Sequence, residues 1–154
     1  MLLSKVFSPK SINIDLQSED KDEVFEELIE ELVNACPSLD RAAALDAVRE
    51  RESKMSTGIM KGIALPHGKT NAVKDVRGAI GISRTGIDYD ALDGNPVYIV
   101  FLLLSAADCS ELHLRVLKRL SKLLGNPKFY TALMEQKTPE ALYDLVCKYE
   151  KELN

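Results

Sequence analysis

Cysteine and histidine are scarce in this 154-residue chain, which holds three cysteines and two histidines. The cysteines, Cys36, Cys109 and Cys147, form an odd number and show no CxxC spacing. A disulfide framework or a zinc ribbon needs more cysteines at paired, short intervals, so neither class fits this sequence. Free thiols are typical of a reducing compartment, and we therefore predict a cytoplasmic protein.

The sequence also lacks a long hydrophobic run and an excess of basic residues. The apolar stretch at residues 97–104 is too short to cross a bilayer, and residues 1–7 are too short for a signal peptide. The 20 basic and 24 acidic residues give a net charge of -4 and a pI near 5.3, which leaves no basic field for nucleic acid. We predict one soluble domain over residues 1–154, with no nucleic-acid partner.

The apolar pattern divides the chain into helices and strands. Residues 97–104 are apolar throughout, which is typical of a central strand covered on both faces and therefore of a sheet with helices on both sides. Other strands are predicted at residues 12–16 and 63–65, strands or turns at 79–82 and 87–92, and a loop at 53–61. Helices are predicted from Asp20 to residue 37, from Asp40 to about Arg51 and from Asp108 to Leu124, and two more after the caps Asn126-Pro127 and Thr138-Pro139. The pairs Asp20/Glu23 and Asp108/Glu111 resemble capping boxes.

Residues 62–68, with the sequence GIALPHG, place a histidine directly after a short apolar strand. Pro66 has no N–H and a fixed φ, so a regular strand cannot continue through it, and Gly68 can adopt dihedrals closed to other residues. His67 is therefore expected at the end of a strand, where functional side chains often lie. The alternative is that His67 is only a polar residue in a turn.

The second histidine, His113, lies near the start of the predicted helix at residues 108–124. At 3.6 residues per turn it shares a face with Val116, Leu117, Leu120 and Leu124, so its side chain is expected to point inward. It is either a core histidine satisfied by one hydrogen bond or a partner of His67 at a site. A neutral imidazole can accept a phosphoryl group, and such transfer needs mainly alignment and donors such as Arg, His and backbone N–H groups.

The stretch around His67 resembles the active-site signature of phosphotransferase-system enzyme IIA domains of the fructose/mannitol type. The resemblance rests on Arg51-Glu52, on STGI at residues 56–59 and on GIALPHG at residues 62–68. It extends through ALDG at 91–94, the Pro-Val pair at 96–97 with the run to 104, and ELHL at 111–114, in the order and spacing of that family. Together with the element order, it predicts a single α/β domain with a mixed β-sheet of about five strands flanked by helices on both faces.

The resemblance also implies an activity and a set of roles. His67 matches the phosphorylated histidine, His113 the second active-site histidine and Arg51 the arginine that contacts the phosphoryl group, while Ser56, Thr57 and Gly58 match a phosphoryl-binding loop. The implied protein is a phosphocarrier with a phosphohistidine intermediate, which accepts from phospho-HPr and donates to an enzyme IIB component for fructose-type sugar uptake. It would reach the membrane only through the IIC permease, and it requires no cofactor and no metal. Ile59, Met60 and Leu65 are expected near the centre of the HPr docking surface.

Several alternatives remain open at this point. A regulatory nitrogen-type enzyme IIA would keep His67 but act by phosphorylation-dependent protein binding. Cys109, His113 and His67 could form part of a zinc site, although no fourth ligand is evident. Residues 62–70 approach a Walker A loop but have one residue too many between Gly62 and Gly68-Lys69-Thr70. Arg51 could instead be an exposed cation at a helix C-terminus, where it would favour the helix dipole.

Overall fold

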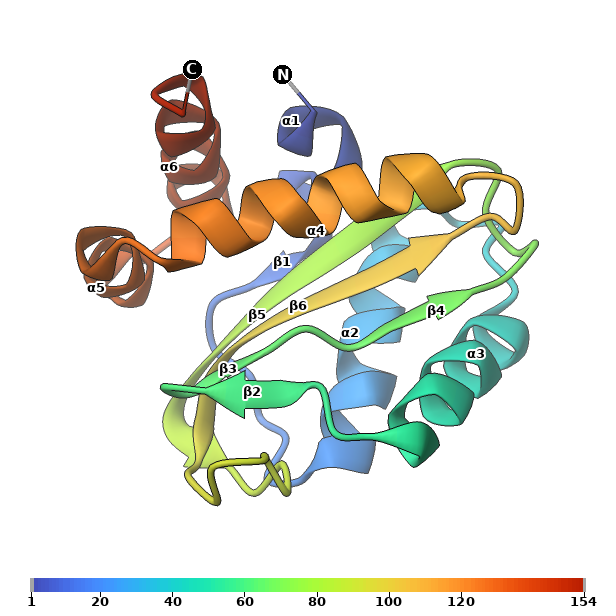
Figure 1. Ribbon diagram of the computed structural model, residues 1–154, viewed down its shortest axis with the longest axis horizontal. Coiled ribbons are helices and arrows are strands. Elements are labelled where there is room, and N and C mark those ends of the chain that lie inside the picture. The colour runs from blue at the N-terminus through green and yellow to red at the C-terminus, as the bar shows by residue number, and fades with distance from the viewer. Residues whose placement is uncertain (1, 154) are drawn as a thin grey trace.

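An open mixed sheet runs through the middle of the protein, with strand β6 (Val97–Ser105) at its centre (Figure 1). The computed structural model describes residues 2–153, and Met60 by its backbone alone. Strand β5 (Val76–Ile87) pairs antiparallel with β6, and β1 (Ile12–Asn13) pairs parallel with β5. On the other side of β6, two short strands, β3 (Ile63–Ala64) and β4 (His67–Lys69), follow each other and both pair parallel with it, while β2 (Gly58–Met60) pairs antiparallel with β3.

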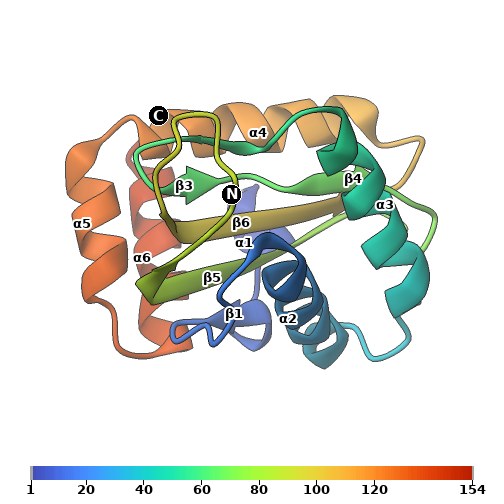
Figure 2. The ribbon, with the colours of Figure 1, turned by 90° about the horizontal axis from the view of Figure 1, so that it is seen from below.

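Helices cover both faces of this sheet (Figure 2). Alternate residues of β6 face opposite cores: Val100, Leu102 and Leu104 pack with helices α2 (Lys21–Ala35) and α3 (Arg41–Lys54). Ile99, Phe101 and Leu103 belong to the core formed with α4 (Ser110–Leu124), α5 (Pro127–Glu135), α6 (Pro139–Lys151) and the short α1 (Leu3–Val6). The prediction of a central strand buried on both faces is therefore confirmed, as is the α/β class with a mixed sheet.

Most of the predicted helix starts are confirmed because their caps are local. Asp20 accepts the Glu23 N–H, Asp40 accepts the Ala43 N–H, and the side chains at 126 and 138 cap α5 and α6 in the same way. The capping box at Asp108 was wrong, since Cys109 occupies the N-cap of α4 and no side chain caps that helix. Helix α3 extends three residues beyond the predicted end at Arg51, which places Arg51 in its last turn.

The strand predictions needed more correction. Over residues 2–153 the sheet has six strands rather than about five, because residues 58–69 form three short strands instead of a loop and one strand, while the segments predicted at 79–82 and 87–92 give only one. Residues 76–87 form one long strand, and residues 14–16 lie outside β1. Lys61 and Gly62, with φ values of 56° and 78°, make a two-residue hairpin turn between β2 and β3. Helix α1 and a 3₁₀ turn (Pro9–Ser11) were not predicted. Within residues 2–153, no helix has the length and apolar character to cross a membrane.

Candidate functional site

His67 owes its position to the break between β3 and β4. The two strands pair with the same edge of β6, and Pro66 separates them because it has no N–H to donate to the ladder. His67 therefore begins β4 rather than ending a strand, and it pairs with Leu103. Gly68 was expected to allow unusual dihedrals in a turn, but its role is one of space. A Cβ at this position would lie 2.7–2.9 Å from the backbone and Cβ of Ala47, so the glycine lets α3 approach the strand closely.

The ring of His67 is held in one tautomer. Its Nδ1 lies 2.9 Å from the carbonyl oxygen of Leu65, which can only accept, so Nδ1 carries the proton. The lone pair is then on Nε2, the nitrogen that is free to attack an electrophile. Burial lowers the pKa of His67, assisted by the charge of Arg51 and opposed by the Leu65 carbonyl and by Glu52. A lowered pKa keeps the imidazole neutral, and hence nucleophilic, near pH 7.

The structure brings the second histidine beside the first. The centroids of the His67 and His113 rings are 5.1 Å apart, with their planes at 50°. His113 is 5% exposed, and its Nδ1 is hydrogen-bonded to the hydroxyl of Ser105, which is fully buried at the end of β6. Burial, together with the charges of His67 and Lys69, lowers the pKa of His113 to about 4. The sequence left two alternatives for His113, a hydrogen-bonded core histidine or a neighbour of His67. In the structure the ring is buried and hydrogen-bonded, and it also lies beside His67.

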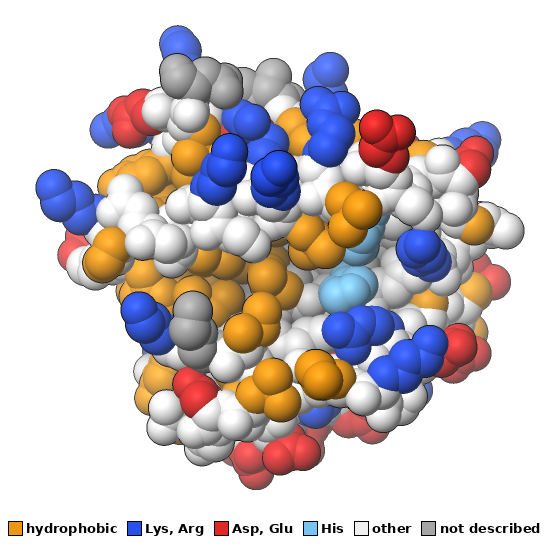
Figure 3. Space-filling view, in the orientation of Figure 1, with side chains coloured by type: hydrophobic (Ala, Val, Ile, Leu, Met, Phe, Trp, Pro, Cys, Tyr) orange, Lys and Arg blue, Asp and Glu red, His pale blue; other side chains and the backbone are white. Residues whose placement is uncertain are grey.

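A cavity of about 570 Å³ opens between α3, β4 and the first turns of α4, and both imidazole rings line it. In Figure 3 the histidine side chains lie in a hollow with Lys and Arg side chains close by and hydrophobic side chains on the other side. The cations in the lining are Arg51, Lys54 and Lys69, against one carboxylate, Glu50. A cavity with this charge is suited to an anionic group that bears several acceptor oxygens.

Arg51 reaches the cavity from the last turn of α3. Its Nη1 donates to the carbonyl of Met55 at 2.9 Å, and the guanidinium has further N–H groups that make no other hydrogen bond to the described part of the chain. The side chain is half-buried and lines the cavity with His67. Its position thus combines the two readings of the sequence, a cation at a helix C-terminus and a member of the site.

The predicted loop residues Ser56, Thr57 and Gly58 do not line this cavity. Thr57 is 4% exposed, and its hydroxyl contacts Glu52 at 2.5 Å and Tyr89 at 2.8 Å in the interior. Ser56 accepts the N–H of Gly58 at 3.2 Å. A Cβ on Gly58 would lie 2.8 Å from both Ala91 and Tyr89, so that glycine allows close packing against residues 89–91.

Sequence reasoning missed two members of the site environment. Lys69 lines the cavity and donates to Ser110 at 2.8 Å, which joins β4 to the first residue of α4. Glu52 was noted only as part of the signature, yet it is 8% exposed and bonded to Thr57, Tyr89 and Lys21. The period-2 pattern of β4 marks Lys69 as a residue on the same side as His67. No local pattern marks a glutamate at a helix end as buried.

Two alternative sites do not form. The sulfur of Cys109 is directed to the carbonyl of Lys74 and to Asp108, and within residues 2–153 no group of three or more His, Cys, Asp or Glu residues could hold a metal ion. Gly68 and Lys69 lie in strand β4, whereas a Walker A motif requires a loop that opens a helix.

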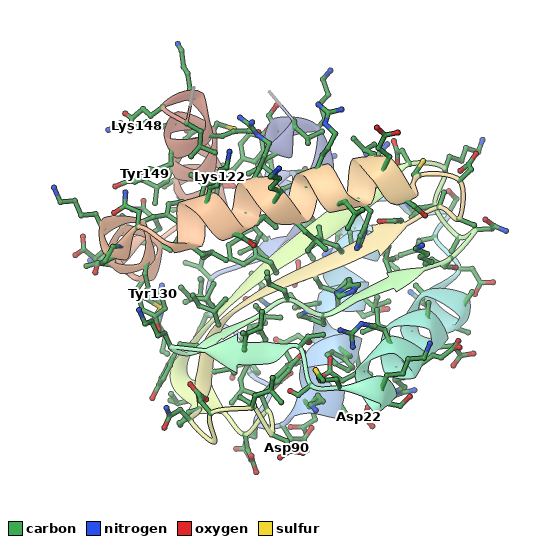
Figure 4. All side chains as sticks on the ribbon, in the orientation of Figure 1. Asp22, Asp90, Lys122, Tyr130, Lys148 and Tyr149 are labelled. Atoms are coloured by element: carbon green, nitrogen blue, oxygen red, sulfur yellow. The ribbon has the colours of Figure 1, made fainter. Side chains whose placement is uncertain are left out.

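A second cavity, of about 450 Å³, lies between the β2–β3 hairpin and the junction of α4 with α5. Figure 4 shows Tyr130 of α5 pointing toward the β2–β3 end of the sheet, and its hydroxyl would lie 3.0 Å from a Cβ on Gly62. Leu65 is 8% exposed and belongs to this groove, while Ile59 at its edge is 49% exposed. The side chain of Met60 lies outside the described residues. The groove is mainly apolar, with a lining of Ile59, Lys61, Ile63, Leu65, Ser121, Leu124, Gly125, Pro127, Tyr130 and Thr131.

Comparison with known proteins places this geometry in context. The family model of the phosphoenolpyruvate-dependent sugar phosphotransferase system, EIIA 2, matches residues 5–149. The fructose-specific EIIABC component of Bacillus subtilis is 34% identical over 151 residues, which are 98% of this chain and 24% of that protein. The fructose-specific EIIA component of Haloferax volcanii is 34% identical over 146 residues, or 95% of each chain. The crystal structure of the nitrogen regulatory protein IIA-Ntr from Neisseria meningitidis matches with a TM-score of 0.87 and 29% identity, over 95% of this chain and 99% of that one.

Proposed function

Because the chain belongs to the EIIA 2 family of the phosphoenolpyruvate-dependent sugar phosphotransferase system, we propose that it is a phosphocarrier that is phosphorylated on His67. The donor is phospho-HPr, and the acceptor is an enzyme IIB component for fructose-type uptake. Residues 1–154 form one EIIA domain, working in the cytoplasm and linked to the membrane only through a IIC permease. The observation that carries the proposal is the neutral, single-tautomer ring of His67 in a cationic cavity.

The transfer step follows from the state of the His67 ring. The Nε2 lone pair attacks phosphorus, the P–N bond to the histidine of HPr breaks, and the leaving imidazole keeps the electron pair of that bond. Bonding through Nε2 makes the His67 ring positive, since Nδ1 retains its proton. Nδ1–H donates a hydrogen bond to the Leu65 carbonyl oxygen, 2.9 Å from Nδ1, and this bond stabilises the charge that develops. In the onward step a nucleophile of enzyme IIB bonds to phosphorus, the P–Nε2 bond breaks, and its electron pair returns to Nε2 of a neutral His67 ring.

Charge on the phosphoryl oxygens is balanced by the cavity. Arg51 supplies N–H donors in a planar array suited to a phosphoryl group, and Lys69 of β4 supplies a second cation in the lining of the cavity. His113 is neutral before the group arrives and lies against His67, so it can donate one N–H or take a proton when the dianion is beside it. Ser56, Thr57 and Gly58 support the site by their hydrogen bonds and close packing rather than by contacting the group.

Partner docking is proposed at the surface beside the cavity. HPr and enzyme IIB must each bring their reactive atom within bonding distance of Nε2, so their interface has to surround the cavity mouth. Large apolar side chains are exposed in this part of the protein, including Ile59 at 49% and Leu114 at 64%. An apolar surface of this kind supports a transient interface, and the EIIABC name of the Bacillus subtilis relative supports an enzyme IIB partner.

The test is direct phosphorylation. The protein is incubated with enzyme I, HPr and phosphoenolpyruvate, and intact-protein mass spectrometry should show one added phosphoryl group, labile in acid and stable in base. His67→Ala should remain unmodified, and His67→Gln controls for packing because it keeps one hydrogen bond to Leu65. Labelling of His67→Ala, or no labelling of the wild type, would contradict the proposal.

The second candidate is a regulatory nitrogen-type enzyme IIA, favoured by the similarity to IIA-Ntr. That protein would accept the phosphoryl group on His67 but would act by binding other proteins according to its phosphorylation state. Transfer from the phosphorylated chain to a fructose-type enzyme IIB separates the two functions. A phosphorylated chain that no enzyme IIB can discharge would favour regulation.

A further inference from the structure

Glu52 is a buried carboxylate that the proposed transfer step does not use. It is 8% exposed, and a carboxylate at that depth persists as an anion only when charges and hydrogen bonds surround it. Lys21 of α2 supplies the charge at 3.2 Å, and the ammonium of Lys21 also lies 5.1 Å from the centre of the Tyr89 ring. Thr57 donates both its N–H, at 2.8 Å, and its hydroxyl, at 2.5 Å.

Tyr89 completes this cluster as a donor. The Thr57 hydroxyl has one hydrogen, which it donates in a hydrogen bond to Glu52. Tyr89 is therefore the donor in the 2.8 Å hydrogen bond between the two hydroxyls. Burial and the nearby charge of Glu52 raise the pKa of Tyr89, which keeps its proton in place. The cluster therefore joins α2, α3, the 55–57 loop and residue 89 around one anion.

One chain of hydrogen bonds leads from Glu52 to the nucleophile. The N–H of Thr57 donates to Glu52, and the carbonyl of Thr57 accepts the N–H of Leu65 at 3.0 Å. The carbonyl of Leu65 in turn accepts Nδ1–H of His67 at 2.9 Å. The group that selects the His67 tautomer is thus held by a segment whose conformation depends on Glu52.

A second route leads from Glu52 to Arg51. The two hydrogen bonds between Glu52 and Thr57 hold the two ends of the segment at residues 53–56 together. The segment then bends so that the carbonyl oxygen of Met55 lies 2.9 Å from Nη1 of Arg51. The side chain of Met55 is 59% exposed, so packing does little to fix this loop from outside. The buried carboxylate is the anchor that sets its shape.

We infer that Glu52 is a positioning residue of the phosphoryl site, which holds Arg51 through Met55 and the His67 ring through Thr57 and Leu65. This inference rests on the proposed function of His67 and adds a residue that never contacts the phosphoryl group. It also assigns Thr57 the task of linking Glu52 to Leu65, in place of phosphate binding.

The test is a double-mutant cycle on the complete chain. Glu52→Gln keeps the size of the side chain but removes its charge, and it should slow transfer from phospho-HPr about tenfold. Adding Glu52→Gln to Arg51→Ala should cost at most about threefold more, because the guanidinium that Glu52 positions is already gone. Thr57→Ser, which keeps the hydroxyl, should transfer at nearly the wild-type rate, whereas Thr57→Val should be slow.

A matched control is available in Glu150, a fully buried carboxylate on α6 that bonds Arg119 at 2.6 Å. Glu150→Gln removes the same kind of ion pair at the other end of the sheet from α3 (Figure 2), so it should lower the melting temperature and leave the transfer rate unchanged. Glu52→Gln at the wild-type rate would overturn the positioning role, and single effects that multiply in the double variant would overturn its route through Met55 to Arg51.

A readout that needs no phosphoryl transfer separates this inference from the proposed function. Nitrogen-15 NMR of the histidine rings should show His67 mainly as the Nδ1–H tautomer in the wild type and a more mixed ring in Glu52→Gln. If the wild type takes no phosphoryl group while this tautomer change occurs, the proposed function fails and the positioning role stands. If transfer is normal and the ring is unaffected by Glu52→Gln, only the positioning role fails.

Discussion

Removing the His113 ring should slow phosphoryl transfer by more than the loss of stability explains. In His113→Ala the buried Ser105 hydroxyl loses its partner, and the ring leaves a void beside His67, whose ring centroid lies 5.1 Å away. An unsatisfied buried hydroxyl costs about 1 to 3 kcal/mol, and for a chain of this length that lowers the melting temperature by roughly 3 to 10 °C. If His113 also serves the phosphoryl group, the transfer rate falls at least about tenfold, or about 1.4 kcal/mol of transition-state stabilisation.

His113→Gln separates the two effects. The glutamine amide can keep a hydrogen bond to Ser105, so the melting temperature should stay closer to wild type than in His113→Ala. It cannot take a proton, and the rate should therefore remain low. Transfer from phospho-HPr is followed by rapid quench at 25 °C and divided by the folded fraction measured by circular dichroism. A His113→Ala protein that melts early yet transfers at the wild-type rate per folded molecule would refute the role of His113 at the site.

Three further outcomes are expected. The pKa of His113 is lowered to about 4 from an ordinary value of 6.5, so its neutral form stabilises the fold above pH 6.5 and that contribution is lost as the pH falls toward 4. The melting temperature of the wild type should therefore drop more over this range than that of His113→Gln, and equal drops would contradict the assignment. Gly68→Ala should destabilise the protein by about 1 to 3 kcal/mol in urea unfolding, since its Cβ would meet backbone atoms of Ala47, and an unchanged midpoint would show that α3 can move away. Ile59→Glu should slow transfer from phospho-HPr while changing the free energy of unfolding by less than about 0.5 kcal/mol, and Leu92→Glu, at an exposed leucine, is the matched control. A wild-type transfer rate in Ile59→Glu would remove Ile59 from the docking surface.

The two histidines illustrate how one environment can assign different tasks to the same side chain. His67 begins a strand, its Nδ1 is hydrogen-bonded to a carbonyl, and the residue lines the cavity. His113 bonds a hydroxyl, which can donate or accept, so its ring is free to change tautomer or protonation state as charge builds up beside it. In the proposed transfer step, such a pair would combine a fixed nucleophile with an adaptable donor.

Short-range patterns in the sequence determined several helix starts, the central strand and the position of His67. Caps at Asp20, Asp40, Asn126 and Thr138 act within four residues, so the starts of those helices could be read directly. The apolar run at residues 97–104 required cover on both faces wherever it lay in the fold. Pro66 interrupts a strand by its own covalent structure, and His67 was singled out for that reason.

Tertiary structure alone decided which groups meet. The site joins the last turn of α3, the start of β4 and the first turns of α4, and that meeting depends on both short strands lying along one edge of β6. Thr57 and Glu52 look like surface polar residues in the sequence, because a hydroxyl or a carboxylate is buried only if distant donors satisfy it. Their partners, Lys21 and Tyr89, come from other elements, so the turn of Thr57 away from the cavity and into the protein is a property of the fold and not of the local sequence.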